Sequence, residues 1–317
     1  VNMLSTRDRF QYDIATGRGT LPVVSIITLV VWALSLSGDW FSALTSLCCC
    51  GLSAYLLIEM DTHFALMRTR TTLPSCLLLA FYTVGTFFHG SPTQSVVAPL
   101  FVLMLFSLLR SYESYDASST IFNAFLFTGL AGLIVPCVVW VSPFVFFYMI
   151  YLRSLSAKTF FAGIIGLTLP YWFLFSYGAY TDNISLVVPY LSACVQFHPF
   201  TDYTLLSISQ IVSLASLLLL FIVYGVFYLQ SAFKDKVQTR IMLTSIFWMG
   251  VWTFLLILLQ PRYLNALLPA AAVSTAVLGG HLFALSFSRV VRIVFYSTIT
   301  LLVLLLVFNQ WIHLFIS

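Results

Sequence analysis

Residues Trp140–Tyr180 read WVSPFVFFYMIYLRSLSAKTFFAGIIGLTLPYWFLFSYGAY, two apolar runs separated by a short segment that carries Arg153 and Lys158. The second run is long enough to cross a bilayer as a helix, which takes about 20 residues. Short loops with Lys and Arg stay on the cytoplasmic side of polytopic membrane proteins. The stretch therefore predicts a helix, a cytoplasmic turn and a second helix, and it allows every other loop to be assigned to a side.

The composition of the whole chain indicates an integral membrane protein. Of its 317 residues, 61% are hydrophobic and 8% are charged, and the mean hydropathy is +1.01. A soluble domain carries about 25% charged residues, so the 14 basic and 10 acidic side chains here are too few for a water-exposed surface. The apolar runs are continuous rather than alternating, which favours helices over strands. We expect an all-α fold in the bilayer and no nucleic-acid partner.

The hydropathy pattern predicts about eleven spans in one transmembrane domain, residues 21–317, after a cytoplasmic segment, residues 1–20, that is too polar for a signal peptide. If all eleven cross, every Lys and Arg except Arg262 falls on one side, which must be cytoplasmic. An odd number of crossings places the N-terminus inside and the C-terminus outside. The predicted spans are roughly 21–37, 41–59, 72–88, 95–109, 119–134, 137–152, 159–180, 204–229, 241–259, 263–287 and 293–316.

The segment 119–152 must hold two crossings that turn near Pro136. Each leg would reach only about 24 Å at 1.5 Å per residue, which is shorter than the ~30 Å hydrocarbon core. A single long helix would place Arg153 and Lys158 outside and break the charge pattern. We therefore favour two short helices, tilted or in a thinned bilayer, over a re-entrant hairpin buried among other helices.

One long non-cytoplasmic loop is predicted, over residues 181–203, TDNISLVVPYLSACVQFHPFTDY. It contains no Lys or Arg, and its centre is apolar. We expect this loop to lie along the outer membrane surface, where such a segment often covers a site that opens toward lipid.

Polar residues at the predicted outer face are the candidates for chemistry, because burying them near a membrane is costly. Carboxylates, imidazoles and a guanidinium together suit a phosphate, a general base or a divalent cation, although no resident metal or cofactor is predicted. We assign Asp39 and Asp182 as the candidate catalytic base or cation ligand. The candidate phosphate-binding residues are Arg262, His198 and Asp202, and the other outer polar residues are His89, Asn183 and His313. For each single histidine, a solvated or interfacial place is the more frequent one.

Arg262 is the basic residue that departs from the positive-inside pattern. It lies in LLQPRYLNALLP, a tight outer turn. One interpretation is an interface anchor that reaches outer headgroups or pairs with Asp182 or Asp202. The other is recognition of a lipid-linked phosphate, which arginine binds with two parallel hydrogen bonds.

The predicted inner rim carries acidic and basic residues near one another. Glu59, Asp61 and His63 end the second span close to Arg68 and Arg70. We interpret them as interfacial ion pairs rather than a proton path, because no carboxylate lies at mid-membrane depth. His281, in VLGGHLFAL, is the nearest to a buried titratable group, and Gly279-Gly280 beside it would allow another helix to approach closely.

Three stretches between Glu59 and Tyr177 carry a resemblance: EMDTHFALMRTRTTLP, SLLRSYESYDASSTIFNAFLFTGLAGLIVP and YLRSLSAKTFFAGIIGLTLPYWF. They resemble an uncharacterised family of multi-pass inner-membrane proteins of Bacteroidota, in which a basic turn, an apolar helix and a Gly-x-x-x-Pro-Tyr helix follow in this order. The matching residues here are Arg153, Lys158, Gly166, Pro170 and Tyr171. The resemblance implies a helical fold and a place in the bacterial inner membrane, and it implies no catalytic residue.

A fainter resemblance is to lipid-linked-sugar glycosyltransferases of the GT-C class. Gln260-Pro-Arg262-Tyr-Leu, followed by Leu268-Pro269, is similar to their late R-Y-L and L-P segment, and Asp39 follows the first span where that class places an acidic residue. The chain departs from the class in its first outer loop, which covers only about Ser37–Trp40.

Three hypotheses about function follow. The first is a cell-envelope enzyme that handles a polyprenyl- or lipid-linked substrate at the outer face. The second is a transporter or flippase with broken helices near Pro136, Pro143 and Pro170. The third is a non-catalytic subunit of an envelope assembly. The sequence does not decide whether the chain is an enzyme.

Overall fold

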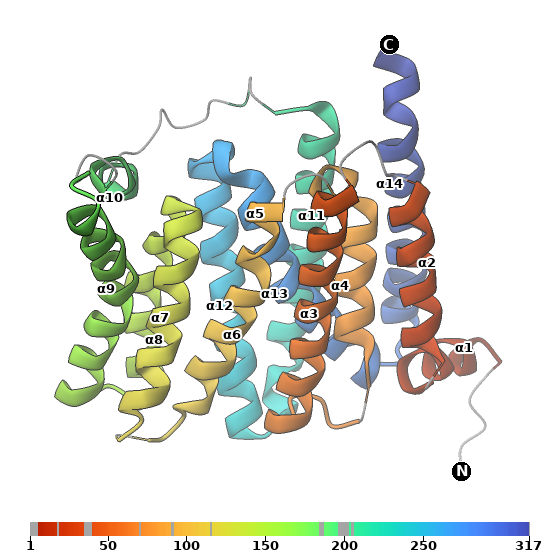
Figure 1. Ribbon diagram of the computed structural model, residues 1–317. Coiled ribbons are helices and arrows are strands. Elements are labelled where there is room, and N and C mark those ends of the chain that lie inside the picture. The colour runs from red at the N-terminus through yellow and green to blue at the C-terminus, as the bar shows by residue number, and fades with distance from the viewer. Residues whose placement is uncertain are drawn as a thin grey trace.

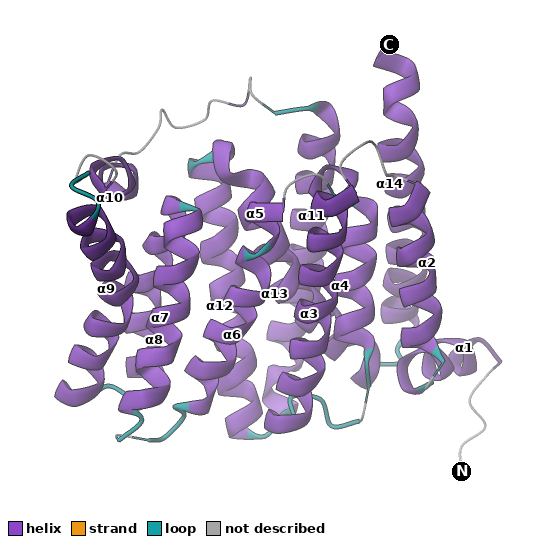
Figure 2. Ribbon diagram, in the orientation of Figure 1, coloured by secondary structure: helices purple, strands orange, loops and turns teal. Residues whose placement is uncertain are grey.

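The computed structural model describes residues 6–17, 19–34, 40–69, 71–89, 92–114, 116–183, 187–195, 203 and 206–316, of which 6–10, 195 and 312–316 are described by their backbone alone. Within these ranges all regular structure is helical, so the all-α prediction is confirmed for this part of the chain (Figure 2).

Seven helical segments among the described residues are long and apolar enough to cross a membrane. They are α3 (Trp40–Phe64), α5–α6 (Pro92–Ser95 and Val97–Arg110), α9 (Ala157–Tyr180), α11 with η5 (Ile208–Ser231 and Ala232–Lys234), α12 (Val237–Leu259), η6 with α13 (Pro261–Tyr263 and Leu264–Leu285) and α14 (Arg289–Ile316). Four shorter apolar segments lie among them, namely α2 (Thr20–Leu34), α4 (Leu73–Val84), α7 (Ser118–Ile134) and η2–α8 (Pro136–Val141 and Ser142–Tyr151). The remaining helices are α1 (Thr6–Thr16), η1 (Thr86–Phe88) and α10 (Val187–Val195).

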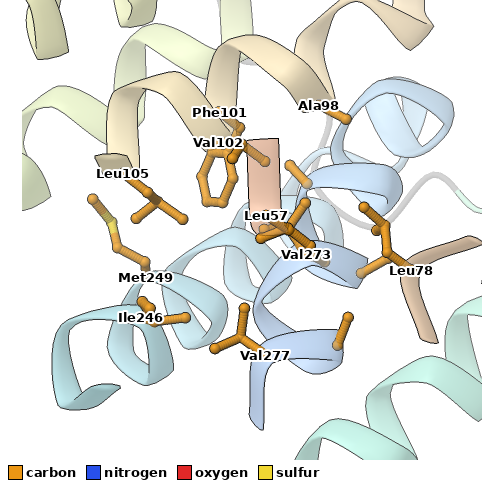
Figure 3. Packing of buried hydrophobic residues seen from close by; sticks show 14 of the residues in the cluster. Leu57, Leu78, Ala98, Phe101, Val102, Leu105, Ile246, Met249, Val273 and Val277 are labelled. Carbon is orange, nitrogen blue, oxygen red and sulfur yellow. The ribbon is translucent and has the colours of Figure 1, made fainter. Parts of the chain in front are cut away.

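Helix α13 is the centre of the bundle. The most apolar 18-residue stretch of α13 is buried throughout, and α4, α6, α11 and α12 pack around the helix. Small side chains make this possible, because in a membrane they allow helix backbones to approach closely. At Gly280, a Cβ atom would lie 2.6 Å from Cγ of Pro74 in α4. Figure 3 shows side chains from several helices meeting in this core, among them Leu57, Leu78, Phe101, Met249 and Val273.

Helix α9 lies at one edge of the bundle (Figure 1) and packs mainly on α7. Glycines on both helices form this contact. A Cβ atom at Gly166 would lie 2.4 Å from the carbonyl oxygen of Phe122, so the backbones nearly touch. The opposite side of α9 is aromatic, and Trp172 and Phe173 on it are exposed.

The segment 119–152 is a hairpin of two legs, α7 and η2–α8. The backbone N–H of Glu113 donates to the carbonyl oxygen of Leu152 at 3.0 Å, which brings the residues before α7 and after α8 together. An ion pair of Arg153 with Glu113, 3.9 Å long, lies at the same place. The indole N–H of Trp252 in α12 donates to the carbonyl oxygen of Trp140 at 2.8 Å. The turn in the middle of the hairpin is thereby fixed to the neighbouring helix.

The two ends of the bundle differ in charge. Helix α1 lies across one end and the last turns of α14 reach the other (Figure 1). We call these the α1 end and the α10 end. The turns after α3, α6, α8 and α11 and the start of α14 lie at the α1 end, and they carry most of the basic side chains. Arg262, in η6, lies at the α10 end.

Part of the predicted surface loop 181–203 is helical. Helix α10 packs on η2 and α9, and the indole N–H of Trp140 donates to the carbonyl oxygen of Cys194 at 3.0 Å. Val187 is buried, whereas Val188 and Leu191 are exposed. Residues 184–186 and 196–202 lie outside the described part, so the placement of the whole loop on the membrane surface stays a prediction.

Candidate functional site

Two of the five site residues assigned from sequence are described by the structure. Asp39, His198 and Asp202 lie outside the described residues. Asp182 follows α9 in a left-handed conformation (φ 50°) that an aspartate tolerates, and its side chain is exposed. Arg262 is also exposed. Between the two described members, Asp182 and Arg262, there is no ion pair. Because the other three members lie outside the described residues, the outer polar cluster stays a prediction.

A groove of about 700 Å³ runs along α4 between α2 and α14. Helices α2 and α14 both pack on α4, so that α4 forms the floor of the groove and the other two form its walls. The floor is made of residues at helical spacing, Leu73, Cys76, Leu77, Ala80, Thr83 and Val84. The small side chains of Cys76 and Ala80 deepen its middle.

The walls of the groove are apolar and open to the surroundings of the protein. Val23 and Ile27 of α2 and Ile299 and Val303 of α14 line it, and they are 56%, 50%, 39% and 54% exposed. Side chains that line an enclosed cavity would be buried, so these exposed fractions show that the groove is open along its side. In a membrane, what enters from that side is lipid.

Polar groups line the groove only toward its two ends. At the α1 end these are Asp13 and Thr20. Near the other end the Thr83 hydroxyl donates to Oγ1 of Thr28 at 2.9 Å. The lining of α14 begins at Phe295 and ends at Leu306, which corresponds to about 17 Å at 1.5 Å per residue. That is close to half of the ~30 Å hydrocarbon core, the depth of one leaflet.

An ionic cluster around a buried His281–Asp235 pair lies elsewhere at the α1 end, near the C-terminal end of α13. Nε2 of His281 is 3.0 Å from Oδ2 of Asp235, and Nη2 of Arg68 is 3.3 Å from Oδ1 of the same carboxylate. The side chains of His281 and Asp235 are each 4% exposed. Asp61 lies nearby on α3 and accepts a hydrogen bond of 3.0 Å from the backbone N–H of Met67.

The environment of Asp235 favours its ionised form. Burial alone would raise the pKa of this carboxyl, but the imidazole of His281 and the guanidinium of Arg68 outweigh it, so the pKa is lowered from its ordinary value. The sequence pointed to Asp61, Arg68 and His281 and missed Asp235. That residue lies between Lys234 and Lys236 and has the pattern of a solvated turn. A lone histidine within the apolar α13 was the available signal.

His89 lies in the turn after η1 at the α10 end and is buried, contrary to the interpretation of this histidine as solvated or interfacial. Its ring stacks on Trp32 of α2 with 3.6 Å between centroids. Burial lowers the pKa of the imidazole to about 4, so His89 is neutral at pH 7. We assign it a packing role.

Comparison with known proteins gives no relative: no protein-family model, curated protein or solved structure matches this chain. Among the described residues, no group of three His, Cys, Asp or Glu side chains is arranged to hold a metal ion.

Proposed function

We propose that this chain is a multi-pass membrane protein that takes a lipid or a lipid-linked substrate into the groove between α2, α4 and α14. The observation that carries the proposal is the groove itself, with its volume of about 700 Å³ and its apolar middle. The volume falls in the range of small-molecule sites, about 300–1,000 Å³. A site for a soluble ligand has a few polar side chains that converge on the ligand. The middle of this groove has no such polar side chains. A single hydrocarbon chain needs none.

The direction of entry follows from the ends of the groove. Asp13, Gly19 and Thr20 line the α1 end, where a polar headgroup would lie. A Cβ atom at Gly19 would meet nothing within 4 Å, so there is room at this end. The substrate would enter from the leaflet on the side of α1 and lie with its chain along α4.

The placement in the cell is part of the proposal. We infer about eleven crossings in a bacterial inner membrane, with the N-terminus inside and the C-terminus outside, and the gathering of basic turns at the α1 end supports this orientation. The groove then opens toward the cytoplasmic leaflet. Reporter fusions at Ser317 and within residues 231–240 should report opposite sides of the membrane. A report from the same side would reject this topology.

The groove can be tested with a photoreactive phospholipid, added as a small fraction of the lipid in nanodiscs that hold the full chain. Cross-links mapped by peptide mass spectrometry should concentrate on the lining residues of α2, α4 and α14. Ala80 is half-buried on the groove floor, and Ala80→Trp would fill the groove. We expect this variant to lose these cross-links several-fold.

The matched control is Ala162→Trp, because Ala162 is also half-buried but lies on α9 at the other side of the bundle. This variant should keep the wild-type cross-linking pattern. An even distribution of cross-links over all outward helices of the wild type, or an unchanged pattern in Ala80→Trp, would show that the groove holds no lipid.

Chemistry on a polyprenyl-linked substrate at the outer face is a separate and more specific hypothesis. It rests on Arg262, which is exposed at the α10 end, with Asp39, Asp182, His198 and Asp202 as its expected neighbours. The groove does not support this hypothesis. The end of the groove where a headgroup would lie is the α1 end, whereas Arg262 lies at the α10 end. The Arg262→Lys comparison below tests it independently.

A further inference from the structure

We propose that His281 is a proton-binding site that fastens three separate segments at the α1 end: α13, the turn after α3 and the turn after α11. His281 belongs to α13, Arg68 to the turn between α3 and α4, and Asp235 to the turn between α11 and α12. Both partners contact the same carboxylate, at 3.0 Å and 3.3 Å. One buried carboxylate thus joins segments that are far apart in the sequence.

As long as Asp61 is ionised, the charges of the cluster balance only when the histidine carries a proton. Asp61 and Asp235 supply two negative charges, and Arg68 supplies one positive charge. With a neutral imidazole the cluster has a net charge of −1, and with an imidazolium it is neutral. Asp235 and His281 are almost fully buried, and an uncompensated buried charge is strongly unfavourable. Proton binding should therefore tighten the contact of both turns with α13, and proton release should loosen it.

The other neighbours of the imidazole do not replace the missing charge. Tyr228 of α11 lies edge-on to the imidazole at 5.8 Å between centroids, and its hydroxyl donates to the backbone oxygen of Arg240 in α12 at 3.0 Å. Around the same turns of α13, α4 contributes Pro74, α14 contributes Phe295 and α1 contributes the amide of Gln11. Among the described residues, the ionisable groups that face His281 are Asp61, Arg68, Tyr228 and Asp235.

The same end of α13 holds helix α1. Nε2 of Gln11 donates to the carbonyl oxygens of Phe283 and Ser286, both at 3.0 Å. Asp13 and Ile14, one turn of α1 further on, line the groove. A change in how this end of α13 is held would therefore reach the groove entrance, although the proton site stands on its own geometry and does not depend on the proposed function.

Hydrogen exchange of the full chain in nanodiscs tests the proposal. Peptides that cover residues 65–72 and 232–236 would be followed from about pH 6 to about pH 8, a range in which histidines change charge, with rates corrected for the intrinsic effect of pH. In the wild type the opening equilibrium of both turns should rise several-fold over this range. Its upper limit is about tenfold per pH unit, the limit for one proton. The carboxylate of Asp235 stays ionised throughout, because its pKa is lowered.

Two histidine variants distinguish proton binding at His281 from a general effect of pH on the protein. His281→Gln should abolish the pH dependence of opening in both turns. His63→Gln is the matched control, since His63 is an exposed histidine at the end of α3 on the same side of the bundle, and it should keep the wild-type profile. A flat profile in the wild type, or an unchanged profile in His281→Gln, would overturn the proposal.

If His281→Gln does not fold, two charge variants still decide the matter. Arg68→Gln removes a positive charge near the imidazole, so the proton should bind more tightly and the midpoint of the profile should move to higher pH. Asp61→Asn removes a negative charge and should move the midpoint to lower pH. A cluster with a structural role only would leave both midpoints unmoved, and that result would also overturn the proposal.

Discussion

Helices α13 and α9 have similar lengths and a similar apolar character, yet they lie at opposite extremes of burial. Within the most apolar 18-residue stretch of each helix, 100% of the residues are buried in α13 and 22% in α9. The size of the side chains separates them. Helix α13 reads LNALLPAAAVSTAVLGGHLFAL, rich in alanine, whereas the second half of α9 reads LPYWFLFSYGAY. Because lipid tails are as apolar as a protein interior, hydropathy does not sort helices between the two, and close packing of small residues does.

The largest effect is expected for phenylalanines in the two helices. Phe283 of α13 is 0% exposed and Phe173 of α9 is 69% exposed. Phe283→Ala should lower the free energy of unfolding by about 3–5 kcal/mol, because it leaves a cavity in the core. Phe173→Ala should cost less than about 1 kcal/mol, because lipid replaces the lost contacts. Reversible unfolding in bicelles would measure both, and equal losses would contradict the division between core and lipid face.

Enlarged side chains should give the next largest difference. Ala271 of α13 is 0% exposed, and Ala271→Leu should destabilise the fold by about 1–3 kcal/mol through overpacking. Ala162 of α9 is half-buried, and Ala162→Leu should leave the free energy of unfolding within about 0.5 kcal/mol of the wild type. If Ala271→Leu is tolerated as well as Ala162→Leu, the core around α13 is less tightly packed than its burial indicates.

The glycine face of α9 is the exception within its own helix and sharpens the comparison. Gly166→Ala would place a Cβ atom 2.4 Å from a backbone oxygen of α7, so we expect a loss of about 1–2 kcal/mol, in the lower part of the overpacking range. In α3, a Cβ atom at Gly51 would meet nothing within 4 Å. Gly51→Ala should be neutral or stabilise the helix by up to about 1 kcal/mol. The same unfolding assay applies, and a loss in both variants would point to helix flexibility rather than to the contact of α7 with α9.

The smallest effect on stability is expected at the start of α13. Arg262 is exposed, so Arg262→Lys should change the free energy of unfolding by no more than about 0.5 kcal/mol. If the guanidinium grips a lipid-linked phosphate with its planar fork, the lysine variant should fail to restore the phenotype of a deletion strain at matched expression. Full complementation would indicate that Arg262 is an interface anchor, a role that the point charge of lysine also fulfils.

Several features of the fold followed from local sequence signals. The hairpin 119–152 was predicted from the charges of Arg153 and Lys158, and the ion pairs of these residues with Glu113 and Asp116 lie at its open end. Gly279-Gly280 predicted a close helix approach, which Pro74 and Tyr224 make. Such features are recognisable because charge, glycine and proline act within a turn or two of the chain.

The candidate sites did not follow from the sequence in the same way. The outer cluster was inferred from residue type and predicted side alone, and its members Asp39, His198 and Asp202 lie outside the described residues. The groove was not predicted, because Cys76 and Ala80 on its floor look like any residues of a buried helix. It exists because α2 and α14 both pack on α4 without closing over it.

The sequence by itself determined the class of the protein, the approximate position of its helices and the gathering of basic turns at one end, since hydropathy, helix length and charge are properties of single segments. Only the tertiary structure decided which helix is the core, where the groove opens and that Asp235 meets His281. The physical reason is that a bilayer makes every spanning helix apolar, so a linear pattern cannot tell a face that meets lipid from one that meets protein. Pairing between distant charges depends on contacts that no local signal encodes.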